Sequence, residues 1–308
     1  MEIASILMIV LGLCIFEVVS GIDNAVINAE VLATMSAKAR RWFLIYGILI
    51  AVFLVRGLLP WGIVWATNPD IGPIGALLAS FSNDPHIHES IEASAPILML
   101  GGGVFLLFLF LHWLFMEEKS FGLHSEKLFL KYGAWFFAVA SIILVVIVTM
   151  ALKTNPILAL SAVIGSSAFF ISDGFKRNAK ENEQRLLSNT SNMSDISKIM
   201  YLEIIDTTFS IDGVLGAFAF TMSIPLIILG NGLGAIVIRQ LTIGNIDRIK
   251  NYVYLKNGAM YSILCLSLVM IFEGFHVEVP TMLSPVVTIA IIAYFLLKSL
   301  SHAKKNAI

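Results

Sequence analysis

Five carboxylic acids within two long apolar segments of the chain, where acids are rare, are candidates for chemistry. They are Glu17 and Asp23 in the segment 3–34, and Glu203, Asp206 and Asp212 in the segment 199–220. An ionised side chain in hydrocarbon costs roughly 2.5–3.5 kcal/mol on insertion scales. Acids at such positions normally face the interior of a helical bundle or an aqueous cavity, and they mark a substrate or ion pathway.

The same spacing of acids occurs in both halves of the chain. The stretch FEVVSGIDN (16–24) and the stretch IDTTFSIDG (205–213) each place an acid six positions before the acid of an Ile-Asp pair. Further along, GILIAVFLVRG (47–57) aligns without gaps to GNGLGAIVIRQ (230–240), so that Arg56 matches Arg239. This pattern predicts an internal repeat.

The residue types at these positions favour a hard divalent cation. Carboxylates, the Asn24 amide and backbone carbonyls are the oxygen ligands that Mg²⁺, Ca²⁺ and Mn²⁺ prefer, and no Cys or His stands beside the acids to suit Zn²⁺ or Cu⁺. Arg56 and Arg239 are expected to act as counter-charges. Two further candidate site residues are Asn231 and Glu273.

The charge balance of this set suggests how a transport cycle would run. Five acids and two arginines leave three negative charges, and a divalent cation reduces these to one. An empty site would lower its charge by binding protons, so exchange of a divalent cation for protons is a natural cycle.

Helical geometry limits how the acids of the second half can converge. Glu203 and Asp206 are three residues apart and share a face. Asp212 is six residues past Asp206, about 240° further round an ideal helix. Either the site wraps the helix, or the helix breaks near 210–213 and its unwound carbonyls become ligands. Ser20-Gly21 offers the same opportunity in the first half.

Composition indicates the elements that must hold these residues. Of 308 residues, 58% are hydrophobic and 13% are charged, about half the charged fraction of roughly 25% that is usual in soluble domains. Mean hydropathy is +0.88. These values argue against an aqueous enzyme or a nucleic-acid-binding protein, and they predict an all-α, polytopic membrane bundle.

We expect nine transmembrane helices. The apolar runs are 3–34, 42–65, 94–116, 132–152, 156–173, 199–220, 225–243, 257–274 and 281–298. The first is too long for one straight crossing, so it must tilt, break or extend beyond the bilayer. No basic residue precedes Lys38, so this first run is expected to be a retained span rather than a removable signal peptide.

Basic residues predict the orientation of the chain. With the N-terminus outside and the C-terminus in the cytoplasm, 17 of the 20 Lys and Arg residues are cytoplasmic, only Lys153 is outside, and Arg56 and Arg239 lie within spans. The two halves are then inverted relative to each other, as in many secondary transporters. The predicted domains are a first repeat with extra spans (1–173), a flexible cytoplasmic linker (174–198) and a second, inverted repeat (199–308).

These motifs resemble the TerC family of bacterial integral membrane proteins, named for tellurite resistance. The segment EIIDTTFSIDGVLGAFAFT (203–221) is close to that family's second-half signature, and Glu17 with Ile22-Asp23-Asn24 is similar to its first-half pattern. The resemblance implies export of Mn²⁺ across the bacterial inner membrane, with the membrane acids as metal ligands. The usual TerC core has seven spans, so nine spans would indicate an enlarged branch.

Other functions remain alternatives. One is a small-solute exporter similar to the lysine exporters, whose spans also form inverted halves. Another is a membrane component that binds metal without transporting it. An intramembrane aspartyl protease with an Asp23–Asp212 dyad is disfavoured because the Gly-x-Gly-Asp setting is absent. The expected function is therefore a non-enzymatic exporter of a divalent cation, without a resident cofactor, whose partners are the lipid bilayer and the transported ion.

Overall fold

A computed structural model describes residues 3–47, 50, 56–78, 85–119, 123–189, 194–244 and 252–306, and within them it contains helices and no strands. The elements are α1 (Ile3–Ser20), α2 (Ile22–Ala33), α3 (Ala37–Trp42), the π-helix η1 (Phe43–Gly47), α4 (Arg56–Thr67), the 3₁₀-helix η3 (Pro69–Ile71), α5 (Gly72–Leu78), α6 (Pro85–Met116), α7 (His124–Leu130), α8 (Trp135–Thr154), α9 (Pro156–Asn189), α10 (Asp195–Phe218), α11 (Ile224–Gly244), α13 (Leu255–Gly274) and α14 (Leu283–Asn306).

The all-α membrane bundle predicted from composition is confirmed. Seven of the described helices are long and apolar enough to cross a membrane, namely α1, α6, α8, α9, α11, α13 and α14. The chain is therefore a multi-pass membrane protein. Of the other two predicted spans, 42–65 divides into α3, η1 and α4 around residues outside the described set, while 199–220 is the charged helix α10.

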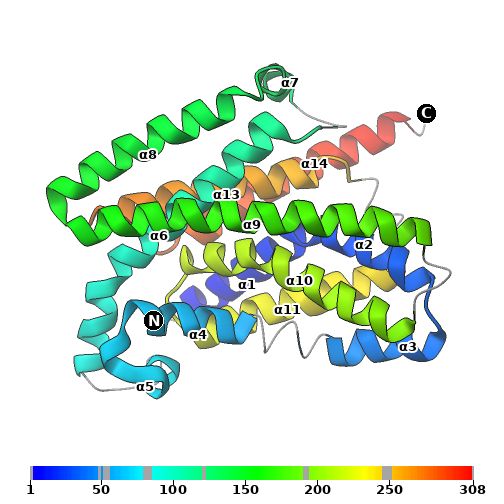
Figure 1. Cartoon of the computed structure of the whole chain (residues 1–308), viewed down its shortest axis with the longest axis horizontal. Coiled ribbons are helices and arrows are strands. Elements are labelled where there is room, and N and C mark those ends of the chain that lie inside the picture. The colour runs from blue at the N-terminus through cyan, green and yellow to red at the C-terminus, as the bar shows by residue number, and fades with distance from the viewer. Residues whose placement is uncertain are drawn as a thin grey trace.

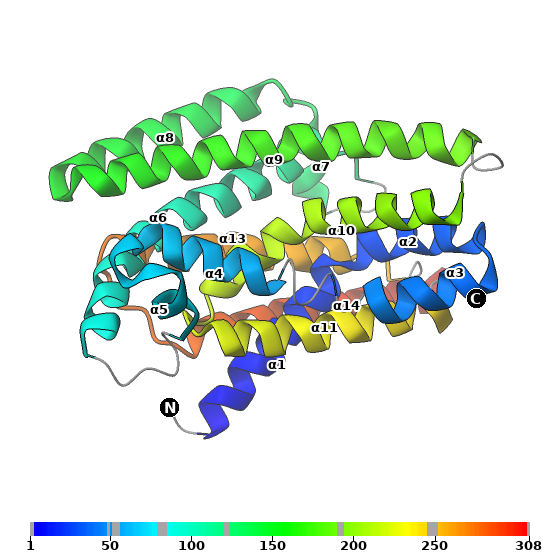
Figure 2. The same cartoon turned by 60° about the horizontal axis from the view of Figure 1, so that its bottom comes forward.

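The two acid-bearing segments differ in continuity. The first long apolar run changes direction at Gly21, which separates α1 from α2 (Figure 2). The backbone hydrogen bond from Gly21 N to Glu17 O is kept at 3.0 Å, so the change is a bend rather than an unwound stretch. In contrast, α10 is a continuous helix past 210–213. The sequence left two alternatives, a site that wraps a continuous helix or a helix that breaks near 210–213. The continuous helix is the one observed.

Two predicted connections are shorter than expected. The linker 174–198 was predicted to be flexible, but α9 continues as a helix to Asn189 and α10 begins at Asp195. The reason lies in the sequence: Ala, Lys, Glu, Gln, Arg and Leu predominate over 179–187, and these residues favour helix even when polar. The connection 66–93, which was predicted to lie outside, likewise contains η3, α5 and the first turns of α6.

Helix α6 lies in the middle of the bundle and packs against both α9 and α13. Three consecutive glycines allow this close approach, which is typical of membrane helices. A side chain at Gly101 would meet the Ser161 carbonyl of α9 at 2.9 Å, and one at Gly103 would meet the Ser267 carbonyl of α13 at 3.0 Å. Buried phenylalanines, including Phe105 and Phe108, fill the adjoining core.

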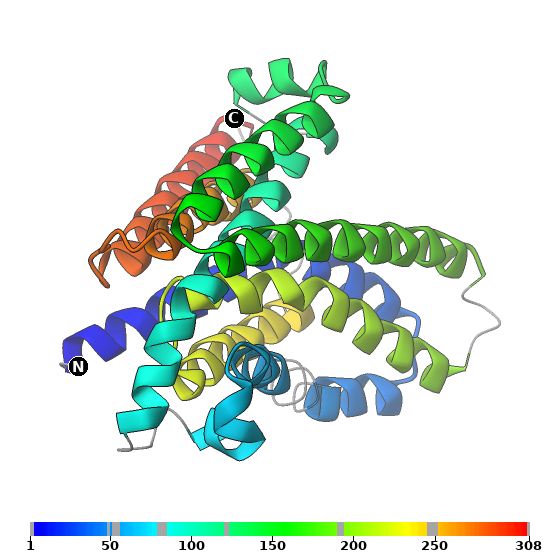
Figure 3. The same ribbon diagram turned by 60° about the vertical axis from the view of Figure 1, so that its left-hand side comes forward.

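The helices run back and forth between two ends of the molecule. In Figure 1, α5 and the turn between α8 and α9 lie toward one end, and α3 and the C-terminus lie toward the other. The segment α1–α2 and the helix α10 run in opposite directions (Figure 2). Figure 3 shows α10 and α11, in lime and yellow, beside the cyan α4. The elements with repeated motifs are thus neighbours.

Candidate functional site

Glu17 and Arg56 form the first charged pair of the site. Glu17 lies near the end of α1 with 4% of its surface exposed, and Arg56 begins α4 with 5% exposed. The Arg56 Nε donates a hydrogen bond of 3.0 Å to Glu17 Oε1, and Arg56 Nη2 contacts the same oxygen. Glycines of two other helices leave room for this carboxylate, because Cβ atoms at Gly213 and Gly234 would collide with the Glu17 side chain.

Asp206 lies between the two arginines of the repeat. Its Oδ2 is 3.8 Å from Arg56 Nη1 and 3.7 Å from Arg239 Nη2. The same Arg239 Nη2 is 3.8 Å from Glu203 Oε1, which agrees with the predicted common face of Glu203 and Asp206. Residues from α1, α4, α10 and α11 are therefore joined in one charged group.

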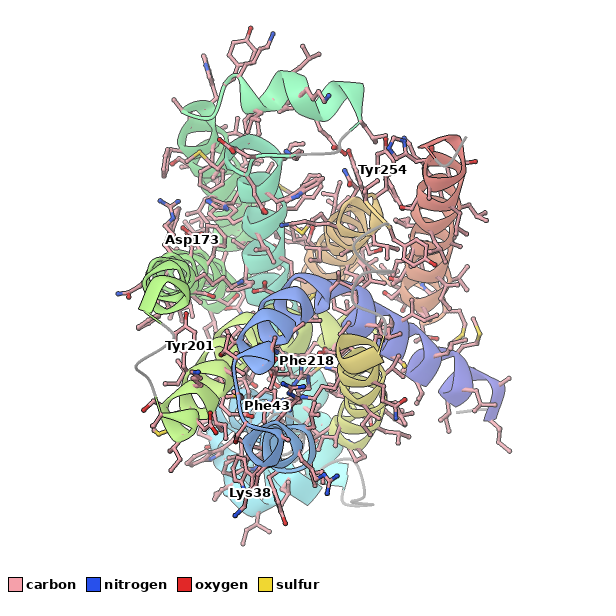
Figure 4. The ribbon with its side chains drawn as sticks, turned by 90° about the vertical axis from the view of Figure 1, so that its right-hand side faces the viewer. Lys38, Phe43, Asp173, Tyr201, Phe218 and Tyr254 are labelled. Carbon is pink, nitrogen blue, oxygen red and sulfur yellow. The ribbon has the colours of Figure 1, made fainter. Side chains whose placement is uncertain are left out.

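The π-helix η1 holds Arg239 in place. Arg239 Nη1 donates a 2.9 Å hydrogen bond to the Phe43 carbonyl, and its guanidinium lies 4.4 Å from the centre of the Phe43 ring. Figure 4 labels Phe43 among the side chains enclosed by the bundle. Short π-helical segments are frequent at functional sites. This support for Arg239 could not be inferred from the apolar pattern of 42–65.

Asp212 points to a different helix from Asp206. Its Oδ2 lies 2.5 Å from the Nζ of Lys176, on α9. Both side chains are mostly buried, with 16% and 13% exposed. The predicted rotation of about 240° between Asp206 and Asp212 thus directs them to opposite neighbours of α10.

One cavity of about 220 Å³ connects these groups. Its charged lining includes Glu17, Arg56, Asp206, Asp212, Lys176 and Arg239. Asn28 and Ser210 contribute polar groups to the lining, and Ala259, Met260 and Ile263 of α13 contribute apolar surface. Glu17 of the first half and Asp206 and Asp212 of the second therefore face one shared space within the apolar bundle, whereas Glu203 is not part of its lining.

Sequence reasoning missed a further charged group that lines the same cavity. Arg177 Nε lies 2.9 Å from Asp173 Oδ2, and Arg177 Nη2 lies 3.2 Å from His112 Nε2. Figure 4 shows Asp173 on α9, beside α6. A second pair joins Glu117 to Lys256. The one available signal was the spacing of Asp173 and Arg177, which places opposite charges four residues apart at the end of an apolar run.

Comparison with protein families identifies the relatives of the chain. The family model described as "Protein of unknown function (DUF475)" matches residues 22–306. The chain belongs to the DUF475 family. No curated protein matches the chain, and no solved structure matches it. The DUF475 match includes every charged residue that lines the cavity except Glu17, which precedes the first matched residue.

Two other predicted site residues, Asn231 and Glu273, do not line the cavity of this DUF475 protein, and two more cannot be compared with it. The side chains of Asp23 and Asn24 lie outside the described set, although both residues belong to α2. Asn231 is fully buried on α11, one turn before Gly234, and does not line the cavity. Glu273 lies ten residues past Ile263 on α13, about 15 Å further along the helix, and is not brought to the site.

Buried oxygen atoms without hydrogen-bond partners are the distinctive feature of this region. Among the described residues they include both carboxylate oxygens of Glu203, Oδ1 of Asp212, Oδ1 of Asn28 and the amide oxygen of Asn231. Buried polar groups normally have partners, and those that lack them call for an explanation. No three His, Cys, Asp or Glu side chains in the described part of the chain are grouped closely enough to hold a metal ion.

Proposed function

We propose that this DUF475 protein is a membrane transporter that exports a divalent cation, with Mn²⁺ as the favoured substrate. The observation that carries the proposal is the set of buried carboxylate and amide oxygens that lack hydrogen-bond donors in and around a cavity inside the bundle. Such oxygens are hard ligands with lone pairs to offer, and a divalent cation would satisfy them.

Charge supports a divalent substrate. Glu17, Glu203, Asp206 and Asp212, together with Asp23 from the repeat, supply five negative charges. Arg56, Arg239 and Lys176 supply three positive charges to the same region. Two negative charges remain, and one divalent cation neutralises them. This equality of charge matters in a low-dielectric interior, because a buried charge without a counter-charge is costly there.

The preference for Mn²⁺ rests on the resemblance to the TerC family. The matching positions are Glu17 with 22–24 in the first half and 203–221 in the second. In this proposal Asp23 and Asp212 are equivalent ligands from inverted repeats, and the loaded cation lies between α2 and α10. The contacts of α10 with both α1 and α2 are consistent with that arrangement.

Transport assays in inside-out membrane vesicles test the proposal. Uptake is measured for Mn²⁺, Ca²⁺, Mg²⁺, Zn²⁺ and tellurite, with and without a pH gradient. We expect saturable Mn²⁺ uptake that increases when the vesicle interior is acidic. Uptake of lysine and other amino acids is measured in a second series, because paired acids and bases in the cavity would also suit a zwitterion.

Two neutral variants show whether the acids carry this activity. Glu203→Gln and Asp212→Asn keep the side-chain shape and remove one negative charge each. We expect each to reduce Mn²⁺ uptake at least about tenfold, since an interaction with a charged group contributes roughly 1.5–3 kcal/mol. Glu89→Gln is the matched control because Glu89 is an exposed carboxylate of the outer connection. Normal Mn²⁺ uptake by both variants, or none by the unmodified protein, would reject the proposal.

A further inference from the structure

Lys176 introduces a positive charge into the cavity from outside the repeated motifs. Its Nζ lies 2.5 Å from Asp212 Oδ2, and both residues line the cavity. The lysine belongs to α9, whereas the motifs that repeat lie on α1, α2, α4, α10 and α11. The internal repeat therefore does not account for this ion pair.

The lysine and its neighbour have separate partners. Arg177 pairs with Asp173 four residues earlier on the same helix, at 2.9 Å. Lys176 instead reaches across to α10 and makes a contact between two helices. Asp212 keeps its second oxygen, Oδ1, buried and without a hydrogen bond. One side of the Asp212 carboxylate is thus neutralised by an ammonium, and the other offers a lone pair.

The other cations of the site are held differently. Arg56 bonds to Glu17 and lies near Asp206, while Arg239 is fixed by the carbonyl and ring of Phe43. A guanidinium is a planar group suited to several fixed partners, whereas an ammonium is a compact charge on a flexible four-carbon stem. Of these three cations, the lysine is the one whose form permits exchange with a metal ion.

We propose that Lys176 is a tethered counter-cation that occupies the Asp212 side of the site when the site is empty and is displaced by the transported divalent cation. This inference rests on the proposed transport function. The ammonium prevents Asp212 from being left as an unpaired buried charge between transport events. Because it is tethered, its effective concentration at Asp212 is high and it lowers the apparent affinity for the ion.

Displacement of an ammonium also favours divalent over monovalent ions. Replacing the ammonium by Na⁺ or K⁺ leaves the charge at Asp212 unchanged. Replacing it by a divalent cation adds one positive charge next to Asp212, so only the divalent ion gains attraction there. Asp173 lies one turn earlier on α9 and lines the same cavity, so it provides an alternative partner for the displaced ammonium.

Mn²⁺ binding to the purified full chain in nanodiscs tests the proposal. Lys176→Met removes the charge and keeps the length of the side chain, and Lys176→Gln is a second variant if Lys176→Met does not fold. Lys153→Met is the matched control, because Lys153 is an exposed lysine in the last turn of α8 and is not part of the cavity lining. We expect Lys176→Met to bind Mn²⁺ about tenfold or more tightly than the unmodified protein, and Na⁺ or K⁺ to inhibit this binding. Lys153→Met should bind Mn²⁺ as the unmodified protein does.

Thermal unfolding with and without Mn²⁺ provides a second readout. Loss of a purely structural ion pair would lower the unfolding temperature but would not enlarge the rise that Mn²⁺ causes. Without metal, Lys176→Met should unfold at a lower temperature than the unmodified protein, and Mn²⁺ should raise its unfolding temperature by a larger amount. The double variant Lys176→Met with Asp212→Asn should lose the gain in Mn²⁺ affinity.

The outcomes distinguish this inference from the proposed function. Unchanged or weaker Mn²⁺ binding by both Lys176 variants, with normal binding and transport by the unmodified protein, would overturn the role of Lys176 alone. Equal tightening by Lys153→Met would also overturn it, because a general change in the net charge of the protein would then explain the result. If the unmodified protein neither binds nor transports any tested cation, the proposed function and this inference are both rejected.

Discussion

At the scale of residues, the buried acids and bases depend on one another. Glu17, Arg56, Asp206 and Arg239 are each at most 9% exposed. Taking such groups out of water costs several kcal/mol per ion, and the pairs offset this cost only while both partners are present. A site built in this way has little tolerance for the loss of a single charge, whichever partner is removed.

The Glu17–Arg56 pair provides a direct test of this dependence. Arg56→Met leaves the Glu17 carboxylate buried without its principal hydrogen-bond donor. We expect a loss of roughly 3–5 kcal/mol in unfolding free energy, measured as a lower midpoint of unfolding in detergent. Adding Glu17→Gln should restore most of the stability but not Mn²⁺ transport. If the double variant is no more stable than Arg56→Met, the loss comes from side-chain packing instead of charge.

Part of this residue-level arrangement could be predicted from the sequence. The equivalent spacing of Glu17 and Asp206, and of Arg56 and Arg239, predicted a common region, and the structure brings these four residues together. Lys176 was assigned to the cytoplasmic linker 174–198 because that stretch is polar and basic residues gather on the cytoplasmic side. Only the crossing of α9 over α10 places its ammonium at Asp212.

At the scale of elements, α1 and α11 approach closely around the site. An added Cβ at Gly234 would lie 2.6 Å from the Glu17 Cβ and 2.9 Å from the Cys14 carbonyl oxygen. The carbonyl belongs to the helix backbone and cannot rotate away. The position of the Glu17 carboxylate is therefore set by how tightly these two helices pack.

Gly234→Ala should separate α1 from α11 and displace Glu17. We expect a loss of roughly 1–3 kcal/mol in unfolding free energy, as is usual for an overpacked contact, together with reduced Mn²⁺ uptake. Gly174→Ala is the control, because an added Cβ there meets no atom within 4 Å. Normal stability and uptake for Gly234→Ala would show that the two helices adjust freely.

The ends of the elements were harder to predict than their existence. Hydropathy located the apolar centre of seven of the nine predicted spans, but helix α9 extends 16 residues beyond the predicted limit at 173. Helix formation in a polar stretch depends on intrinsic propensity and local ion pairs, to which a hydropathy measure does not respond. The bend at Gly21 and the π-helix at Phe43–Gly47 lie within apolar runs, where hydropathy gives no sign of them.

At the scale of the whole molecule, the two ends differ in charge. Lys153 lies at the turn between α8 and α9, at the same end as α5, and it is the single basic residue predicted to be outside. The connections at the opposite end carry most of the Lys and Arg residues, including those of α3 and the C-terminal turn of α14. This asymmetry predicts that the basic end faces the cytoplasm.

Cysteine labelling in whole cells tests this orientation. After Cys14 and Cys265 are replaced by Ala, single cysteines are introduced at Ile74 in α5 and at Ile196 in α10, where both native side chains are 71% exposed. A membrane-impermeant maleimide should label Ile74→Cys in intact cells and Ile196→Cys only after permeabilisation. These two positions lie at opposite ends of the bundle, so one experiment fixes the direction of every helix between them.

The reverse labelling would place the N-terminus in the cytoplasm. If the cavity took up the ion from the same end of the bundle, the proposed transport would then run into the cell. Equal labelling of both positions in intact cells would be incompatible with an odd number of crossings between α5 and the start of α10.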